Sequence, residues 1–263
     1  MPNQILAWGG FVVLILTLLA LDLGVFQRKA HAIRIRESLL LTAFWVGLAL
    51  LFNLGIYWVR GPQAALEFLT GYLIEESLSM DNIFVFVLIF SYFRVPASLQ
   101  PKVLFWGILG AIVLRAIFVI AGLALIHRFQ WLLYLFGGLL VLTGIKMALD
   151  KDHEIHPEKN VALKLFRKLV PVTQDYEGDK FFIRRAGKLL ATPLFVVVFV
   201  VETTDLIFAV DSIPAIFAVT LDPFIVYTSN IFAILGLRAL YFSLSEMMRR
   251  FHHLHYGLSL ILV

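Results

Sequence analysis

Residues 201–215 read VETTDLIFAVDSIPA, so three carboxylates lie inside an otherwise apolar run. A similar run, EESLSMDNIFV, occupies residues 75–85. A carboxylate at the centre of a membrane costs about 2.5–3.5 kcal/mol on insertion scales, and such groups therefore mark ion or substrate pathways. Two acidic clusters of this kind predict that the protein binds ions at membrane depth.

The composition is that of an integral membrane protein. The 263 residues are 60% hydrophobic and 15% charged, whereas a soluble domain is nearer half apolar and a quarter charged. The chain has no cysteine, which excludes disulfides, thiolate metal ligands and cysteine nucleophiles. The net charge of +4 comes from basic residues in short loops, so we expect no nucleic-acid partner.

Seven segments are long and apolar enough to cross a bilayer, which takes about 20 residues. They lie at about 5–26, 38–59, 64–93, 102–126, 130–149, 191–219 and 223–246. A further apolar run begins near Leu254 and continues to Val263. We therefore predict an all-α fold, a polytopic bundle of transmembrane helices.

The basic residues predict the orientation of this bundle. Eighteen of the 22 Lys and Arg residues fall in the connections on one side, two fall on the other side, and two lie within spans. Basic loops stay in the cytoplasm, so we expect the N-terminus of the protein outside and residues 150–190 in the cytoplasm. Within that loop, residues 181–185 and 188–190 flank Ala186 and Gly187 and predict a short hairpin. The simplest role for the loop is a basic tether to anionic lipid.

The two acidic runs belong to an internal repeat. Residues 81–84 (DNIF) recur as 205–208 (DLIF), and residues 114–116 (LRA) recur as 237–239 (LRA). A second register pairs Glu75 with Asp205 and Asp81 with Asp211, and the sequence leaves both registers open. In either register the matching segments are three spans apart, so they cross the membrane in opposite directions. Such inverted repeats are typical of secondary transporters, whose ion site lies near the midplane.

The repeat divides the chain into four parts. We assign residues 1–62 to two N-terminal helices, 63–149 to the first repeat, 150–190 to the basic loop and 191–263 to the second repeat. The second copy ends where the first copy continues, and we therefore expect a bundle that is incomplete at its C-terminus.

Five acids are the candidate cation ligands, with polar and cationic neighbours beside them. The ligands are Asp81, Asp205, Asp211, Glu75 and Glu202; the supporting polar groups are Asn82, Ser212, Asn230 and Asp22; the charge partners are Arg115 and Arg238. Oxygen ligands without histidine favour a hard divalent ion such as Mn²⁺, Ca²⁺ or Mg²⁺. Alternatively, the acids serve only to neutralise the two arginines, although two guanidinium groups are too few to pair with all of them.

Helical geometry limits which acids face one another. Residues six apart point about 120° away from each other, so Asp205 and Asp211 do not share a face of a straight helix. Pro214 cannot donate to the helical ladder, and we expect it to bend or break the helix so that both acids turn inward. Glu76 is left out of the ligand set because it points about 140° away from Asp81.

The segments 75–85 and 201–215 resemble the two signature motifs of the TerC family, with the greatest likeness to its Alx branch. The likeness extends to residues 68–75, 222–226 and 229–238, so it covers essentially the whole chain. The resemblance implies an integral membrane metal transporter related to the LysE superfamily. Alx-like members are linked to manganese export and alkaline response, and the wider family to tellurium resistance and to metal supply for secreted enzymes.

The resemblance places the intramembrane acids of the family at the five candidate ligands named above. Members of the family usually complete an eighth helix and add a ninth, and the C-terminus is where this sequence departs from that pattern. We therefore expect a secondary transporter that exports Mn²⁺ or a similar divalent cation, such as Ca²⁺, with protons as the counter-ion. The alternative is a membrane factor that hands metal to newly secreted enzymes with little turnover of its own.

We expect no enzymatic activity and no tightly bound cofactor. The paired aspartates match neither the GxGD pattern of intramembrane proteases nor the aspartate series of phospholipid transferases. The predicted partners are the lipid bilayer, the divalent cation and protons, together with contacts to the secretion machinery or to further copies of the chain.

Overall fold

The computed structural model describes residues 2–21, 35–149, 170–185 and 187–250. Asp22 and the last apolar run, from Leu254, lie outside the described residues, and so do the side chains of Asp81 and Asp211. The predictions made for these residues stay predictions.

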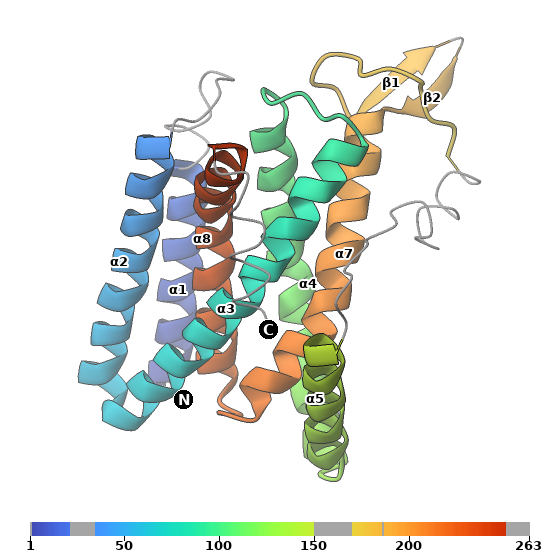
Figure 1. The fold of residues 1–263 in the computed structure, drawn as a ribbon. Helices are drawn as coiled ribbons and strands as arrows, with labels where there is room; N and C mark the ends of the chain where they lie inside the picture. Colours follow the sequence, from blue (N-terminus) through green and yellow to red (C-terminus); the bar gives the residue numbers. More distant parts are fainter. Residues whose placement is uncertain (1, 22–34, 150–169, 186, 251–263) are drawn as a thin grey trace. The chain divides into compact units, whose positions relative to one another are not determined.

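The described chain is almost entirely helical, as predicted (Figure 1). The helices are α1 (Pro2–Leu21), α2 (Ile35–Arg60), α3 (Pro62–Tyr92), α4 (Gln100–Arg128), α5 (Leu132–Leu149), α7 (Pro193–Phe217) and α8 (Pro223–Arg250). Four of the described helices are long and apolar enough to cross a membrane, within Arg36–Arg60, Gln100–Arg128, Pro193–Phe217 and Pro223–Ser245. Helix α3 is longer still, at 31 residues, but carries the first acidic run.

The chain divides into two units, Met1–Ala32 and Ile33–Val263. The first unit contains α1, an apolar helix. In the second unit, α3 packs against α7 and α8, and α4 packs against the same two helices. Helix α8 lies inside the unit. In its most apolar stretch of 18 residues 89% is buried, compared with 22% in the corresponding stretch of α2. The four helices α3, α4, α7 and α8 therefore form the central bundle.

The course of these helices agrees with an inverted repeat. Figure 1 shows α3 and α7 running in opposite directions, and likewise α4 and α8. Residues 75–80 and 205–210 have the same order of buried, half-buried and exposed side chains, and residues 82–83 are buried like residues 212–213. If Asp81 instead matched Asp205, the fully buried Ile83 would match Ile207, which is 62% exposed. Burial thus favours the register that pairs Glu75 with Asp205.

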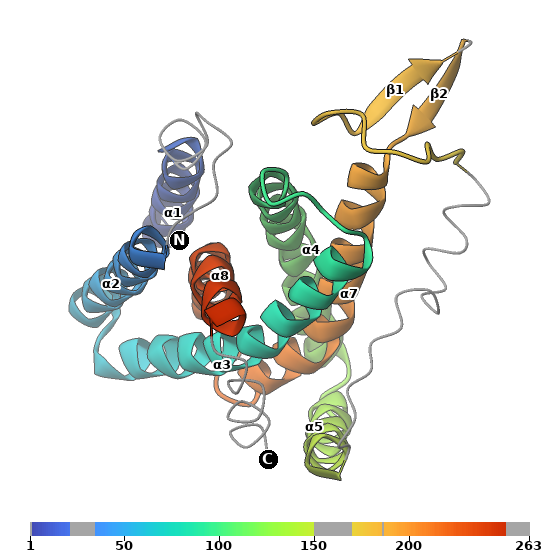
Figure 2. The same cartoon turned by 45° about the horizontal axis from the view of Figure 1, so that its top comes forward.

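The sequence predicted a bend or a break in α7 at Pro214, and the structure shows no break. The helix continues through Pro214 to Phe217 without interruption. The proline lies in the last turn of α7, so a break there would change the direction of only the few residues up to Phe217. Figure 2 shows a bend in α3, although that helix has no internal proline.

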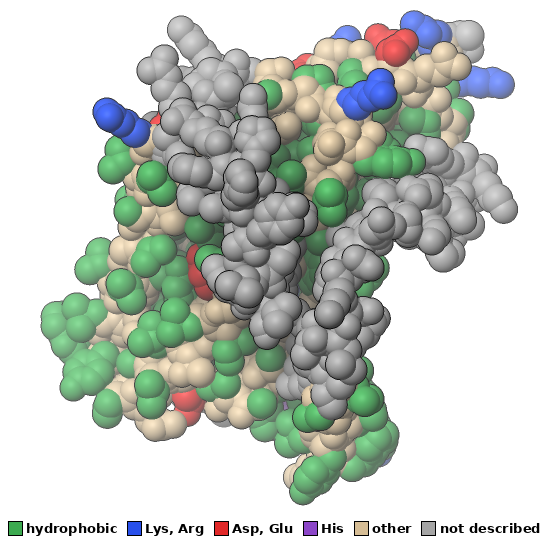
Figure 3. Space-filling model, in the orientation of Figure 1, with side chains coloured by type: hydrophobic (Ala, Val, Ile, Leu, Met, Phe, Trp, Pro, Cys, Tyr) green, Lys and Arg blue, Asp and Glu red, His purple; other side chains and the backbone are tan. Residues whose placement is uncertain are grey.

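The predicted hairpin is present. Strands β1 (Phe182–Arg185) and β2 (Lys188–Ala191) pair antiparallel, and Gly187 at their turn has a φ of 76°, which suits glycine. The Tyr176 hydroxyl donates to the carbonyl of Phe93 at 2.9 Å, which holds this segment to the end of α3. Figure 3 shows Lys and Arg side chains toward this end and hydrophobic side chains over much of the remaining described face.

Candidate functional site

A single buried arginine joins the four helices of the central bundle. Arg115 on α4 is 1% exposed, and its Nη1 lies 2.5 Å from Oε1 of Glu75 on α3. Its Nη2 lies 3.7 Å from Oδ1 of Asp205 on α7. The same Nη1 donates to Oγ of Ser212 on α7 at 3.0 Å and to Oδ1 of Asn230 on α8. The guanidinium group thus holds two carboxylates and two neutral acceptors in one place.

Helical spacing explains why these side chains converge. Ser212 follows Asp205 by seven residues, nearly two turns, so both face Arg115 from the same side of α7. The side-chain amide of Asn230 donates to the carbonyl of Val226 at 2.9 Å, which leaves its oxygen directed at Arg115. Each partner is therefore oriented by its own helix.

The cluster lies at mid-depth and is closed by apolar side chains on both sides. Arg115 is about 20 Å from either end of α4 at 1.5 Å per residue. One apolar cluster contains Val103 of α4 and Val201 of α7, and another contains Val119 of α4 and Ile216 of α7. The ion cluster therefore lies between two apolar layers along the bundle.

Two further acids lie half-buried in the bundle. The carboxylate of Glu202 on α7 lies against Gly110 of α4, in the space that a Cβ atom would fill. Glu76 on α3 takes a hydrogen bond from Tyr72, one turn earlier, and approaches Gly236 of α8. In both carboxylates Oε2 is buried and has no hydrogen-bond partner among the described residues.

Negative charge exceeds positive charge at this site. The described acids are Glu75, Glu76, Glu202 and Asp205, and the arginines are Arg115 and Arg238. When all are ionised, two negative charges remain. The buried Oδ1 of Asn82 and Oγ of Ser79 on α3 also have no partner among the described residues. Buried oxygens without donors call for a water or a cation.

Arg238 is the second predicted charge partner, and it lies close to the first. It is 6% exposed on α8 and lines a small, mostly apolar pocket together with Asp205. Phe86, Ile108 and Leu237 supply much of the remaining lining. Both arginines therefore lie in the centre of the bundle, as the sequence predicted.

The structure brings together five of the predicted site residues, namely Glu75, Asp205, Ser212, Asn230 and Arg115, and places Glu202, Asn82 and Arg238 in the same bundle. Among the described residues, no three acidic or histidine side chains gather closely enough to hold a metal ion. Arg115 pairs with two acids but supplies only one positive charge, so neutralisation of the arginines does not account for all of the carboxylates.

The sequence interpretation missed Gly110, Tyr72 and Glu76. Glu76 was left out because of its angle to Asp81, but its neighbours are Tyr72 and α8, which an angle within one helix does not reveal. The four-residue spacing of Tyr72 and Glu76 was a usable signal, since such pairs meet on a helix surface. Nothing in the sequence distinguishes Gly110 from the glycines of lipid-facing positions.

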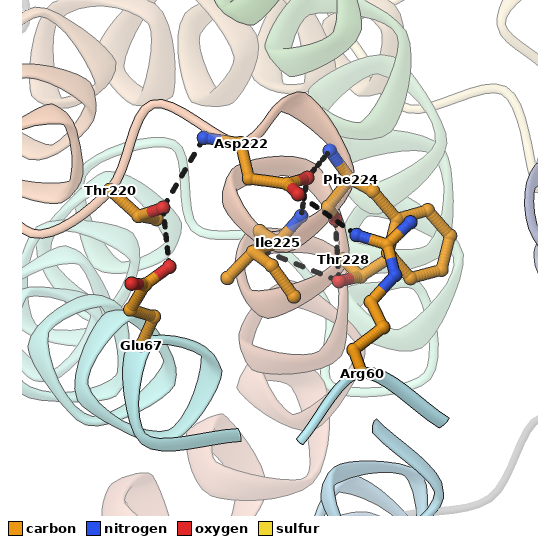
Figure 4. Close-up of polar contacts among 7 residues, drawn as sticks. All are labelled: Arg60, Glu67, Thr220, Asp222, Phe224, Ile225 and Thr228. Carbon is orange, nitrogen blue, oxygen red and sulfur yellow. Dashed lines mark hydrogen bonds and ion pairs between the residues drawn. The ribbon is translucent and has the colours of Figure 1, made fainter. Parts of the chain in front are cut away.

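A second polar network fixes the end of the bundle where α2 meets α3 (Figure 4). Arg60 pairs with Asp222 at 2.9 Å, and its guanidinium carbon lies 4.5 Å from the centre of the Phe224 ring. Asp222 also accepts hydrogen bonds from the backbone of Phe224 and Ile225, and so caps α8. The hydroxyl of Thr220 donates to Glu67 of α3 at 2.7 Å, so α2, α3 and the α7–α8 connection are joined. The sequence interpretation missed this network too.

The hairpin end carries one exposed ion pair. Lys102 at the start of α4 lies 2.8 Å from a carboxylate oxygen of Asp179. This contact lowers the pKa of Asp179 below its usual value. Because both groups are exposed to solvent, the pair adds little stability.

Comparison with known proteins settles the family. The model of the integral membrane protein TerC family matches residues 60–263. The chain belongs to the TerC family. An uncharacterized membrane protein of Myxococcus xanthus is 54% identical over 256 residues, 97% of this chain and 80% of that protein.

Two further TerC relatives carry the name Alx. Proteins of Salmonella typhi and Escherichia coli strain K12, provisionally named membrane-bound redox modulator Alx, are 52% and 50% identical over 98% of this chain and 83% of theirs. This agrees with the Alx branch that the motifs predicted. No solved structure matches the chain.

Proposed function

We propose that this TerC protein is a secondary transporter that exports Mn²⁺ or a similar divalent cation from the cytoplasm. The observation that carries the proposal is the gathering of acidic groups in the central bundle, where four described carboxyl groups accompany two guanidinium groups. If all of them are ionised, two negative charges remain, and burying uncompensated charge is costly. A divalent cation supplies the two missing positive charges.

The chemistry of the ligands supports a hard ion. The site offers carboxylate, amide and hydroxyl oxygens, which suit Mn²⁺, Ca²⁺ and Mg²⁺ better than they suit softer metals. The described residues do not complete a three-ligand site. Asp81 and Asp211 stay candidates for the remaining ligands from the sequence alone.

The proposal includes a direction and a mechanism. The basic connections favour an inner-membrane protein whose 150–190 loop is cytoplasmic and whose N-terminus is outside. Rocking of the two oppositely oriented halves would expose the site to one side at a time. Protons returning through the same carboxylates would exchange for the metal.

A flux assay tests this proposal. Inside-out vesicles or proteoliposomes containing the protein should accumulate Mn²⁺, with Asp205→Asn reducing uptake at least tenfold. Asp175→Asn is the matched control, because Asp175 is an exposed acid outside the bundle. Absence of Mn²⁺, Ca²⁺ and Mg²⁺ flux in the wild type would contradict the transport proposal. Flux that is independent of a pH gradient would remove only the exchange of protons.

The alternative is a hand-over factor that passes metal to secreted enzymes. Arg115 occupies the acids of a closed site, which favours slow turnover. Metal binding without flux in liposomes would therefore support the hand-over factor and not the transporter. A redox role, as in the provisional name of the enterobacterial relatives, cannot use thiol exchange in a chain without cysteine. Control over the supply of a redox-active metal is a route to such a role.

A further inference from the structure

We propose that Arg115 is a resident counter-ion, which occupies the cation site between transport events and must leave Glu75 and Asp205 before a metal ion can bind. This inference rests on the proposed function. In this inference Arg115 competes with the transported cation for the two carboxylates and is not a permanent bridge between the helices.

The position of the guanidinium group supports the competition. Nη1 of Arg115 lies 2.5 Å from Oε1 of Glu75. A calcium ion bound to a carboxylate lies about 2.3–2.6 Å from the oxygen. A metal ion that bridged Glu75 and Asp205 would therefore take the place of the guanidinium group, which lies between the two carboxylates. The other carboxylate oxygen of Glu75, Oε2, has no hydrogen-bond partner among the described residues.

Charge leads to the same conclusion. Glu75, Asp205 and Arg115 together carry one negative charge, all of it buried. A divalent ion that replaces the arginine neutralises both carboxylates, and the displaced guanidinium group stays in the bundle, where it and Arg238 balance the two further acids, Glu76 and Glu202. Since arginine stays protonated in proteins, the exchange has to occur by movement of the side chain.

Neutral acceptors stabilise the resident position. Ser212 and Asn230 accept hydrogen bonds from the same Nη1 atom, and apolar layers close both ends of the cluster. On α3, Asn82 occupies the position equivalent to Ser212 in the favoured register, and its buried Oδ1 has no partner among the described residues. Asn82 therefore has a buried oxygen that the resident arginine does not use.

The resident charge has a consequence for turnover. An exporter must return its empty site across the membrane, and two bare carboxylates would oppose that step. With Arg115 seated, Glu75 and Asp205 keep one negative charge, which one of the returning protons neutralises, so the empty site can return. Loss of Arg115 should therefore spare the exchange of bound metal for metal on the far side, while it impairs net export.

Ser212→Ala tests the competition with the least disturbance. It removes one acceptor from the resident arginine, and a hydrogen bond to a charged group of this kind corresponds to about tenfold in an equilibrium constant. We expect Mn²⁺ to bind the purified full chain about tenfold more tightly, measured by titration calorimetry. Ser77→Ala is the control, because Ser77 is exposed and bonds only the carbonyl of Leu73, and its affinity should equal that of the wild type.

The opposite sign would overturn the inference. If Ser212 is a metal ligand and Arg115 a permanent bridge, Ser212→Ala will weaken Mn²⁺ binding or leave it unchanged. In proteoliposomes, Arg115→Gln should retain at least half of Mn²⁺/Mn²⁺ exchange and lose more than nine-tenths of net flux, and equal loss of both would contradict the resident role. A wild type that binds and moves no divalent cation would overturn the proposed function itself, and this inference with it.

Discussion

Replacing Arg115 by glutamine is expected to destabilise the bundle far more than replacing Glu75 by glutamine. Glu75 is 0% exposed and Asp205 is 5% exposed, so without Arg115 two carboxylates stay buried and lose the cation that contacts both of them. Breaking a buried ion pair in this way costs about 3–5 kcal/mol. In Glu75→Gln the guanidinium keeps Asp205 at 3.7 Å, and the loss is that of one charged hydrogen bond, about 1.5–3 kcal/mol.

The measurement is thermal unfolding of the purified full chain in detergent, followed by circular dichroism. For a chain of this size 1 kcal/mol shifts Tm by about 2–4 °C, so Arg115→Gln should lower it by roughly 6–20 °C. Arg184→Gln on the exposed hairpin is the control and should stay within about 0.5 kcal/mol of the wild type. Adding Glu75→Gln to Arg115→Gln should recover part of the loss, since it removes one of the two uncompensated charges. Equal losses for the two single variants, or a double variant equal to their sum, would refute this reasoning.

Three further predictions follow from other parts of the bundle. Gly122→Ala should destabilise the protein by about 1–2 kcal/mol, because a Cβ atom there would lie 2.7 Å from a ring atom of buried Phe217. Gly47 has open space around it, so Gly47→Ala should be neutral or slightly stabilising. Equal melting temperatures for the two variants would contradict the packing of α4 on α7. Arg60→Gln should lower the free energy of unfolding by no more than about 1–2 kcal/mol, because it removes a half-exposed ion pair and a cation–π contact. A loss of stability as large as that of Arg115→Gln would show that burial does not set the difference between the two variants. Because the chain has no cysteine, Gln130→Cys should react with an impermeant maleimide from outside intact cells and Gln174→Cys only after lysis, and the reverse pattern would invert the proposed orientation.

Much of the bundle could be predicted from the sequence because its signals are local. Apolar runs of about 20 residues indicated the helices, and the Ala186-Gly187 turn between two short runs indicated the hairpin. Carboxylates and arginines inside apolar runs pointed to the central cluster, since such residues are too costly to place against lipid. Arg115, Glu75 and Asp205 could therefore be identified from residue type and position in the chain.

The remaining features depend on which helices become neighbours. The choice between the two repeat registers required the burial of Ile83 and the exposure of Ile207. The pairing of Arg60 with Asp222 spans 162 positions in the chain, and no local pattern connects them. Pro214 was expected to break α7, but its effect depends on its distance from the end of the helix, which a sequence pattern locates only to within a few residues.

The close approach of Glu202 to Gly110 makes this glycine vulnerable in an unexpected way. One added methyl group would overlap the carboxylate, and because that carboxylate is the end of a flexible side chain, it can rotate away while the helices keep their places. A melting curve would then register almost no change, although an acid had been moved out of the bundle centre. A Gly110→Ala variant would therefore resemble a neutral substitution, because it adds little volume, leaves the net charge unchanged and keeps the fold intact. A measurement of ion binding or flux would be needed to detect the displaced carboxylate.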